Sequence, residues 1–166
     1  MAKKSSKKNN LLFSLLAFVF GGAVFGLLAM PYINNKFTIL GSETITGFSG
    51  YSLLDFDANQ TFAILTLLLV IFAGLTALFG LLKLAYDAKL VSNKAFGKFV
   101  GFGLIISSLA LLVTSIVTMI IIPTECSEVA LGGLLSSGNY ANWLALILTT
   151  VSSGLSFVTS LLAIKK

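Results

Sequence analysis

The sequence predicts an all-α membrane protein, a bundle of four transmembrane helices with a small extracytoplasmic β-hairpin in the first outside loop. Three observations lead to this prediction. Hydrophobic residues make up 57% of the 166 residues and charged residues only 10%, whereas a soluble domain is about 45–50% apolar and about 25% charged. Four apolar runs are long enough to cross a bilayer as helices. The lysines gather in the segments that lie on one side of these runs.

The four apolar runs are predicted to span the membrane at residues 11–30, 61–82, 99–122 and 140–164. A helix needs roughly 20 apolar residues to cross the hydrocarbon core. None of the runs contains Lys, Asp or Glu. They also lack the polar–apolar alternation of a barrel strand, and a backbone in lipid must satisfy its own hydrogen bonds, so helices are favoured.

The same pattern predicts the domain organisation. Residues 1–10 form a basic cytoplasmic N-terminus, and residues 11–166 form one transmembrane domain. Pro31 and Pro123 lie at the ends of spans, where we expect them to stop helices. A cleaved signal peptide is the alternative for the first span, but this run is longer than a typical signal core and lacks a good cleavage site.

The distribution of charge predicts the orientation. The segments before the first span, between the second and third, and after the fourth hold ten lysines and one aspartate. The loops 31–60 and 123–139 together hold one lysine and five acidic residues. Because cytoplasmic segments are enriched in Lys and Arg, we expect a multi-pass plasma-membrane protein with both termini in the cytoplasm and these two loops outside.

Small and hydroxyl-bearing side chains in the spans are candidate helix contacts, because close packing of such residues holds helices together in lipid. The glycines form two pairs with Gly-x-x-x-Gly spacing, Gly22 with Gly26 and Gly97 with Gly101. Span four carries a row of hydroxyls that we expect to point inward: Thr149, Ser152, Ser153, Ser156 and Ser160. This face is either a polar path or a packing surface whose hydroxyls bond to carbonyls one turn back, and packing is favoured.

The first outside loop predicts a β-hairpin. The β-prone runs Phe37–Leu40 and Glu43–Thr46 flank a turn at Gly41-Ser42. An isolated hairpin is marginal in water, so we expect it to rest on the helix ends or on another strand. Ser52–Phe56 then forms a short amphipathic approach to span two. Three aromatic residues here either anchor a lid at the interface or form a recognition surface for a partner: Phe48, Tyr51 and Phe56.

The second outside loop predicts a short helical turn at Ser127–Leu131, broken at Gly132-Gly133. Cys126 is the only cysteine in the chain, so it is either free or joins two chains, and it cannot build a cysteine zinc site. Asp55 and Asp57 offer too few oxygen ligands for Ca²⁺ or Mg²⁺. We therefore expect no metal and no cofactor.

Several functions are disfavoured by what the spans and loops lack. The chain contains no His, the usual proton shuttle at neutral pH. Proton pumps, ion-coupled transporters and voltage sensors rely on ionisable groups within the membrane, and the predicted spans have none. The lysines between spans two and three either contact anionic lipid or only set the topology: Lys83, Lys89, Lys94 and Lys98. Nucleic-acid binding is not expected, because there is no Arg and no stacking platform.

The topology loosely resembles that of the claudins, with four spans, both ends inside and a β-prone first outside loop. The claudin Trp-Gly-Leu-Trp run and pair of loop cysteines are missing, since the only Trp is Trp143, and so is the tetraspanin Cys-Cys-Gly pattern. The chain is more similar to uncharacterised small four-span membrane proteins of low-GC bacteria, with Thr46-Gly47-Phe48 leading towards span two. That resemblance implies a bacterial membrane protein and brings no activity with it.

These observations together predict a non-enzymatic plasma-membrane scaffold or accessory protein for partners in the envelope. Its expected partners are the bilayer, with anionic lipid at the cytoplasmic face, and either a second copy of the chain or another membrane protein. The alternative is a passive channel or small-molecule carrier that uses the hydroxyl face of span four. A membrane enzyme acting on lipid is a third hypothesis, and the missing His disfavours it.

Overall fold

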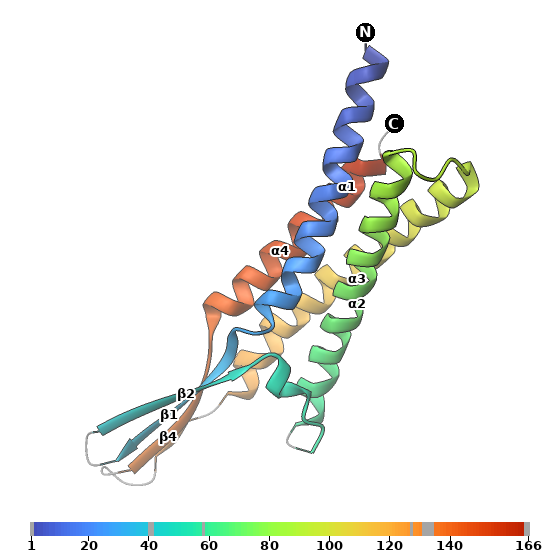
Figure 1. The fold of residues 1–166 in the computed structure, drawn as a ribbon. Helices are drawn as coiled ribbons and strands as arrows, with labels where there is room; N and C mark the ends of the chain where they lie inside the picture. The colour runs from blue at the N-terminus through green and yellow to red at the C-terminus, as the bar shows by residue number, and fades with distance from the viewer. Residues whose placement is uncertain (1, 40–41, 58, 127, 131–134, 165–166) are drawn as a thin grey trace.

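Four long helices form a bundle in the computed structural model, which describes residues 2–39, 42–57, 59–126, 128–130 and 135–164 (Figure 1). The helices are α1 (Ala2–Leu27), α2 (Gln60–Asp87), α3 (Lys94–Glu125) and α4 (Trp143–Ile164). Each contains a stretch long and apolar enough to cross a membrane, which in α1 is Asn9–Leu27. The predicted four-helix, multi-pass architecture is confirmed.

The helices pack in a ring, with α1 and α3 each lying between α2 and α4. Glycines allow α1 and α2 to approach closely. A Cβ added to Gly80 would lie 2.9 Å from the Cα of Phe18, and one added to Gly21 would lie 2.8 Å from Cγ2 of Thr76. Large apolar side chains cover the outside of the bundle, among them Val19, Ile71, Phe102 and Val151. The surface is therefore apolar where lipid would lie, and small residues fill the contacts.

Two helices, α2 and α3, extend beyond the predicted spans at both ends. Both begin at asparagine caps, Asn59 for α2 and Asn93 for α3, whose side chains accept hydrogen bonds from backbone amides of the first turn. The prediction that Pro123 stops span three is wrong, because Pro123 lies inside the last turn of α3. Proline has a φ compatible with a helix and removes only one amide donor, so the helix continues to Glu125.

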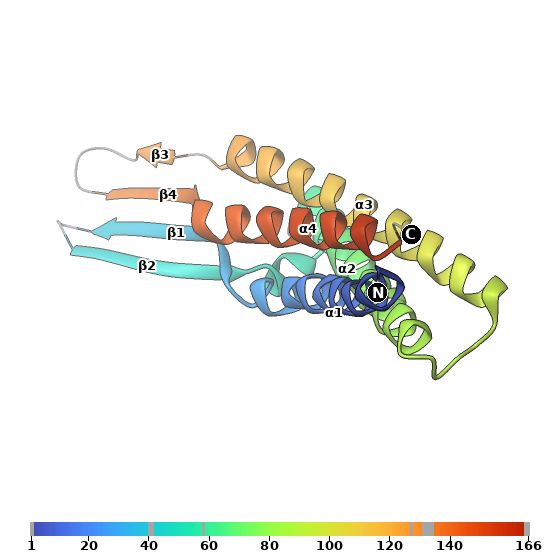
Figure 2. The same cartoon turned by 90° about the horizontal axis from the view of Figure 1, so that it is seen from above.

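One end of the bundle, here called the terminal end, holds the start of α1, the α2–α3 connection and the end of α4 (Figure 1). The opposite end, here called the sheet end, carries an antiparallel sheet. Its strands are β1 (Pro31–Ile39), β2 (Ser42–Ser49), β3 (Glu128–Ala130) and β4 (Leu135–Ala141), in the order β2-β1-β4-β3 (Figure 2).

The predicted hairpin is confirmed as β1 and β2, although its strands are longer than expected. Phe37 pairs with Thr44 and Ile39 with Ser42. The expectation that the hairpin rests on another strand is also confirmed, because β4 from the second loop pairs along the other edge of β1. Strands more than ninety residues apart in the sequence therefore share one sheet.

The second loop differs from the prediction in two places. The expected helical turn is wrong for Glu128–Ala130, which forms β3 because its backbone pairs with β4. Ser127 and residues 131–134, including the predicted break at Gly132-Gly133, lie outside the described residues. Tyr140 was expected to begin span four but belongs to β4, since it pairs with Asn34 of β1.

The segment before α2, where a short amphipathic approach was expected at Ser52–Phe56, forms a 3-10 helix at Tyr51–Leu54. It lies close to the end of α1, where the Tyr51 amide donates to the Leu28 carbonyl and the Gly50 amide to that of Met30. A Cβ on Gly50 would lie 2.9 Å from the Leu28 carbonyl oxygen. Glycine thus permits the sheet to be joined tightly to the bundle.

Candidate functional site

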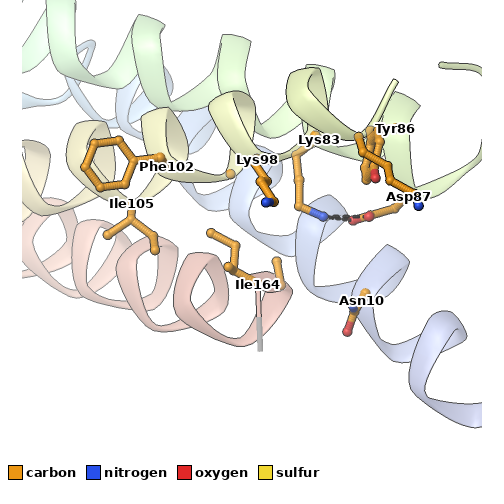
Figure 3. A pocket seen from close by; sticks show the side chains of 12 residues that line it. Asn10, Lys83, Tyr86, Asp87, Lys98, Phe102, Ile105 and Ile164 are labelled. Carbon is orange, nitrogen blue, oxygen red and sulfur yellow. Dashed lines mark hydrogen bonds and ion pairs between the residues drawn. The ribbon is translucent and has the colours of Figure 1, made fainter. Parts of the chain in front are cut away.

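A cavity of about 510 Å³ opens at the terminal end, between the first turns of α3, the last turns of α2 and α4, and α1 (Figure 3). The lysines Lys83, Lys94 and Lys98 line it together with a single acidic residue, Asp87. Three cationic groups against one anionic group leave an excess of positive charge. The cavity is therefore suited to a small anionic group.

The buried polar contacts beside the cavity join α1 to α2. Lys83 is only 5% exposed, and its Nζ lies 2.5 Å and 2.6 Å from the two carboxylate oxygens of Asp87. The hydroxyl of Ser14 on α1 donates to the same carboxylate at 2.6 Å. The ring centroid of Tyr86 lies 5.5 Å from Lys83 Nζ, within the range of a cation–π contact. Ser14 and Tyr86 therefore both contact this ion pair.

The cavity lining changes from basic to apolar along α3. Lys94 and Lys98 lie in the first turns, and Gly101, Phe102 and Ile105 follow on the same side of the helix (Figure 3). This succession fits the spacing of residues three and four apart, which share a helix face. The cavity lining is thus basic over the first turns of α3 and apolar further along the helix.

The four lysines predicted to contact anionic lipid have different environments. Lys94 and Lys98 are exposed and line the cavity, whereas Lys89 is exposed on the α2–α3 connection and does not line it. Lys83 was expected in the link between spans two and three. That placement is wrong, because α2 continues for another turn and Lys83 is buried against Asp87. Whether lipid binds here stays a prediction.

The hydroxyl face of span four lies inside the bundle, and all five of its side chains are buried. Ser152 donates to the Phe20 carbonyl at 2.9 Å and Ser156 to the Ala17 carbonyl at 3.2 Å, both on α1. Thr149, Ser153 and Ser160 donate to carbonyls one turn back on α4. These contacts favour helix packing over a polar path, because each hydroxyl is already bonded to a carbonyl.

The two glycine pairs behave differently. A Cβ on Gly97 would overlap the Tyr86 ring, and one on Gly101 would lie 3.4 Å from Ile164. In contrast, no described atom outside the local chain lies within 4 Å of a Cβ placed on Gly22 or Gly26. Gly22 and Gly26 therefore make no close contact with another helix in the part of the chain that the structure describes, and their role as a helix contact stays a prediction. The neighbouring Gly21 faces the bundle instead.

The three aromatic residues predicted for the outside loop lie at the sheet end, on β2, the 3-10 helix and the turn after it. Phe48, Tyr51 and Phe56 each keep at least two fifths of their surface exposed. The hydroxyl of Tyr51 nevertheless donates to the Phe25 carbonyl on α1 at 2.8 Å, so this residue also anchors the loop. The sequence analysis missed three other exposed apolar residues of the sheet: Phe37, Ile45 and Tyr140.

Tyr32 at the start of β1 was also missed. Its side chain is fully buried, and its hydroxyl lies 2.5 Å from Oγ1 of Thr149 on α4. Burial raises the pKa of Tyr32 to about 12. A tyrosine directly after Pro31 gave no sequence signal for a buried contact with a residue 117 positions away.

Metal ligands are sparse among the described residues. These residues contain no group of three His, Cys, Asp or Glu side chains that could hold a metal ion. Cys126 follows α3 as a free cysteine. Partial burial raises the pKa of its thiol, which lowers its reactivity as a nucleophile.

Comparison of the chain with protein-family models, with curated proteins and with solved structures finds no match. The fold and the site therefore define only a class of protein. It is a multi-pass membrane protein with four apolar helices, an antiparallel sheet at one end and a basic cavity at the other.

Proposed function

We propose that this chain is a non-enzymatic scaffold of the plasma membrane that presents its sheet, outside the cell, to a protein partner. The orientation rests on charge. The terminal end and its neighbouring segments carry ten lysines and one aspartate, and the two loops at the sheet end carry one lysine and five acidic residues. By the positive-inside rule, the terminal end faces the cytoplasm.

The main support for partner binding is the edge strand β2. Its residues 42–48 are all exposed, and no strand of the described chain pairs with the edge that faces away from β1. The strand contains neither Pro nor Lys, which proteins use to block such edges. An extended segment of a partner could add to this edge through backbone hydrogen bonds.

Exposed apolar side chains flank this edge on both faces of the sheet. The register places Phe37 and Phe48 on one face, and Ile45 and Tyr140 on the other. Ile45 is 64% exposed although it is a β-branched residue with no polar atom in its side chain. A partner strand seated on β2 would lie next to Ile45 and Phe48 and thus add apolar burial to the backbone pairing.

The sheet is held firmly on the bundle, which lowers the entropic cost of binding. Tyr32 and Ile33 at the base of β1 are buried in the main apolar cluster, next to residues of α1, α2 and α4. The Asn142 amide, between β4 and α4, donates to the Tyr32 carbonyl at 2.8 Å. The edge strand β2 is therefore held in a fixed position relative to the bundle.

Photo-crosslinking tests the proposal. A photoreactive amino acid replaces Ile45 on β2 or, as a matched apolar control, Val151 on the outer face of α4, and the chains are irradiated in cells of the source organism. We expect a discrete protein adduct from position 45 and none from position 151. Mass spectrometry then identifies the partner as a second copy or another protein. Equal adducts from both positions, or none from position 45 in a folded chain, would contradict the proposal.

A further inference from the structure

We infer that the cavity at the terminal end binds the phosphate-bearing headgroup of an anionic phospholipid, with the start of an acyl chain along its apolar lining. This inference goes beyond the proposed scaffold function and does not depend on it. It rests on the charge of the cavity, on the order of residues along α3 and on the position of both relative to the apolar spans.

The charge of the cavity favours an anion. Lys83 is neutralised by Asp87 at 2.5 Å. Lys94 and Lys98 have no acidic group within 4.0 Å in the part of the chain that the structure describes. Two ammonium groups four residues apart on one helix face can both approach the same phosphate, and each offers three donors. The ion pair of Lys83 with Asp87 adds a polar part to the cavity lining.

The order of residues along α3 matches the order of groups in a phospholipid. Ile105 follows Lys94 by eleven positions, which correspond to about 16 Å of helix axis. The lining changes over this distance from the two lysines, through Gly101, to Phe102 and Ile105. A cavity of about 510 Å³ lies within the range of roughly 300–1,000 Å³ that small-molecule sites occupy. It can therefore hold a headgroup and the first part of a chain.

The depth of the cavity also favours a lipid over a dissolved phosphate. Lys98 immediately precedes the apolar run of α3, and Lys83 immediately follows that of α2. The basic part of the lining therefore lies at the level of the headgroups, where a phospholipid is already concentrated. Phe102 is 68% exposed and continues the apolar lining towards the lipid-facing surface. A free phosphate would make no use of Phe102 or Ile105.

Native mass spectrometry of the full chain in detergent tests the headgroup contact, with phosphatidylglycerol and phosphatidylcholine as probes. We expect several-fold more bound phosphatidylglycerol. Lys98→Gln should reduce this binding at least threefold, and Lys94→Gln provides a second variant of the same kind. Lys89→Gln removes the same charge at the same end but outside the cavity, and should leave binding unchanged. An equal loss with Lys89→Gln would overturn the site in favour of general surface attraction.

A second pair of variants separates the lipid from a dissolved phosphate. Phe102→Ala removes apolar lining, whereas Phe99→Ala changes the same residue type, 67% exposed on the same helix, outside the cavity. We expect only Phe102→Ala to weaken phosphatidylglycerol binding, and millimolar inorganic phosphate not to displace the lipid. Efficient displacement by phosphate, together with no effect of Phe102→Ala, would show a free-anion site and overturn the inference.

Discussion

The hydroxyl of Tyr32 on β1 donates to Oγ1 of Thr149 on α4 over 2.5 Å, and this contact joins the sheet to the bundle. The direction follows from the second bond of Thr149, whose own proton goes to the Ala145 carbonyl at 2.9 Å. A hydroxyl has one proton, so the Tyr32 hydroxyl must be the donor. The two side chains thus form a short chain of hydrogen bonds that ends on the backbone of α4.

This chain of bonds predicts an asymmetry between two variants. Thr149→Val leaves the buried Tyr32 hydroxyl without an acceptor and should cost about 1–3 kcal/mol of unfolding free energy. Tyr32→Phe should cost less, about 1 kcal/mol, because Thr149 keeps its bond to Ala145. The double variant should therefore be less destabilised than the sum of the two single variants.

Unfolding in detergent, followed for both single variants and the double variant, checks this prediction. Thr159→Val is the control, because the Thr159 hydroxyl bonds only to carbonyls of its own helix. Strict additivity of Tyr32→Phe and Thr149→Val would contradict the direct contact.

Tyr32 also predicts how stability changes at alkaline pH. Its pKa is about 12 in the folded chain against 10.0 without the fold, because burial disfavours the phenolate. The contribution to stability is therefore fully present below pH 10 and is lost as the pH rises from about 10 towards 12. Between pH 8 and 11.5, the free energy of unfolding from denaturation curves should fall less steeply with pH for Tyr32→Phe than for the unaltered chain. Identical slopes would show that Tyr32 titrates normally.

The ion pair between Lys83 and Asp87 predicts a different kind of asymmetry. Asp87→Asn leaves the buried Lys83 ammonium without its counter-charge, and should cost about 3–5 kcal/mol. Replacing both residues, with Lys83→Met and Asp87→Leu, removes the buried charges together and should cost far less. Thermal unfolding of the single and double variants measures the difference. A double variant as unstable as Asp87→Asn would mean that the pair itself stabilises the bundle.

The sequence predicted those parts of the fold whose signals are local. The four spans follow from run length, and the β1–β2 hairpin follows from β-prone residues around a glycine turn. β4 could not be predicted in the same way, because its pairing depends on β1, which lies about a hundred residues earlier, and β3 in turn pairs with β4. Tyr140 and Ala141 continue the strand only since β1 offers them hydrogen-bond partners.

The candidate site was predicted in part. The basic segment between spans two and three indicated Lys94 and Lys98, which line the cavity. Burial of Lys83 could not be read from composition, because it arises from contacts between distant parts of the chain, such as that of Ser14 on α1 with Asp87. The spacing of four residues between Lys83 and Asp87 was nevertheless a visible signal of an ion pair within one helix. The cavity itself forms where all four helices meet, and no local sequence pattern predicts that meeting.

The shared sheet predicts a disulfide between the two loops. Asn35 on β1 lies directly opposite Asn139 on β4. With Cys126→Ser as background, Asn35→Cys and Asn139→Cys should therefore form a disulfide on mild oxidation. Lys36→Cys with Asn139→Cys is the control, since Lys36 lies one residue out of register and points to the other face. Gel mobility before and after reduction reports the bond, and equal oxidation of both pairs would contradict the register.

The two ends of the bundle are proposed to face opposite sides of the plasma membrane, with the sheet outside, and cysteine labelling tests this most directly. Ile45→Cys on β2 and Lys89→Cys on the α2–α3 connection are introduced singly into the Cys126→Ser chain. A membrane-impermeant maleimide should label the cysteine at position 45 in intact cells, and the one at position 89 only after permeabilisation. The reverse pattern, or labelling of both positions in intact cells, would contradict an oriented four-span protein that presents its sheet to the exterior.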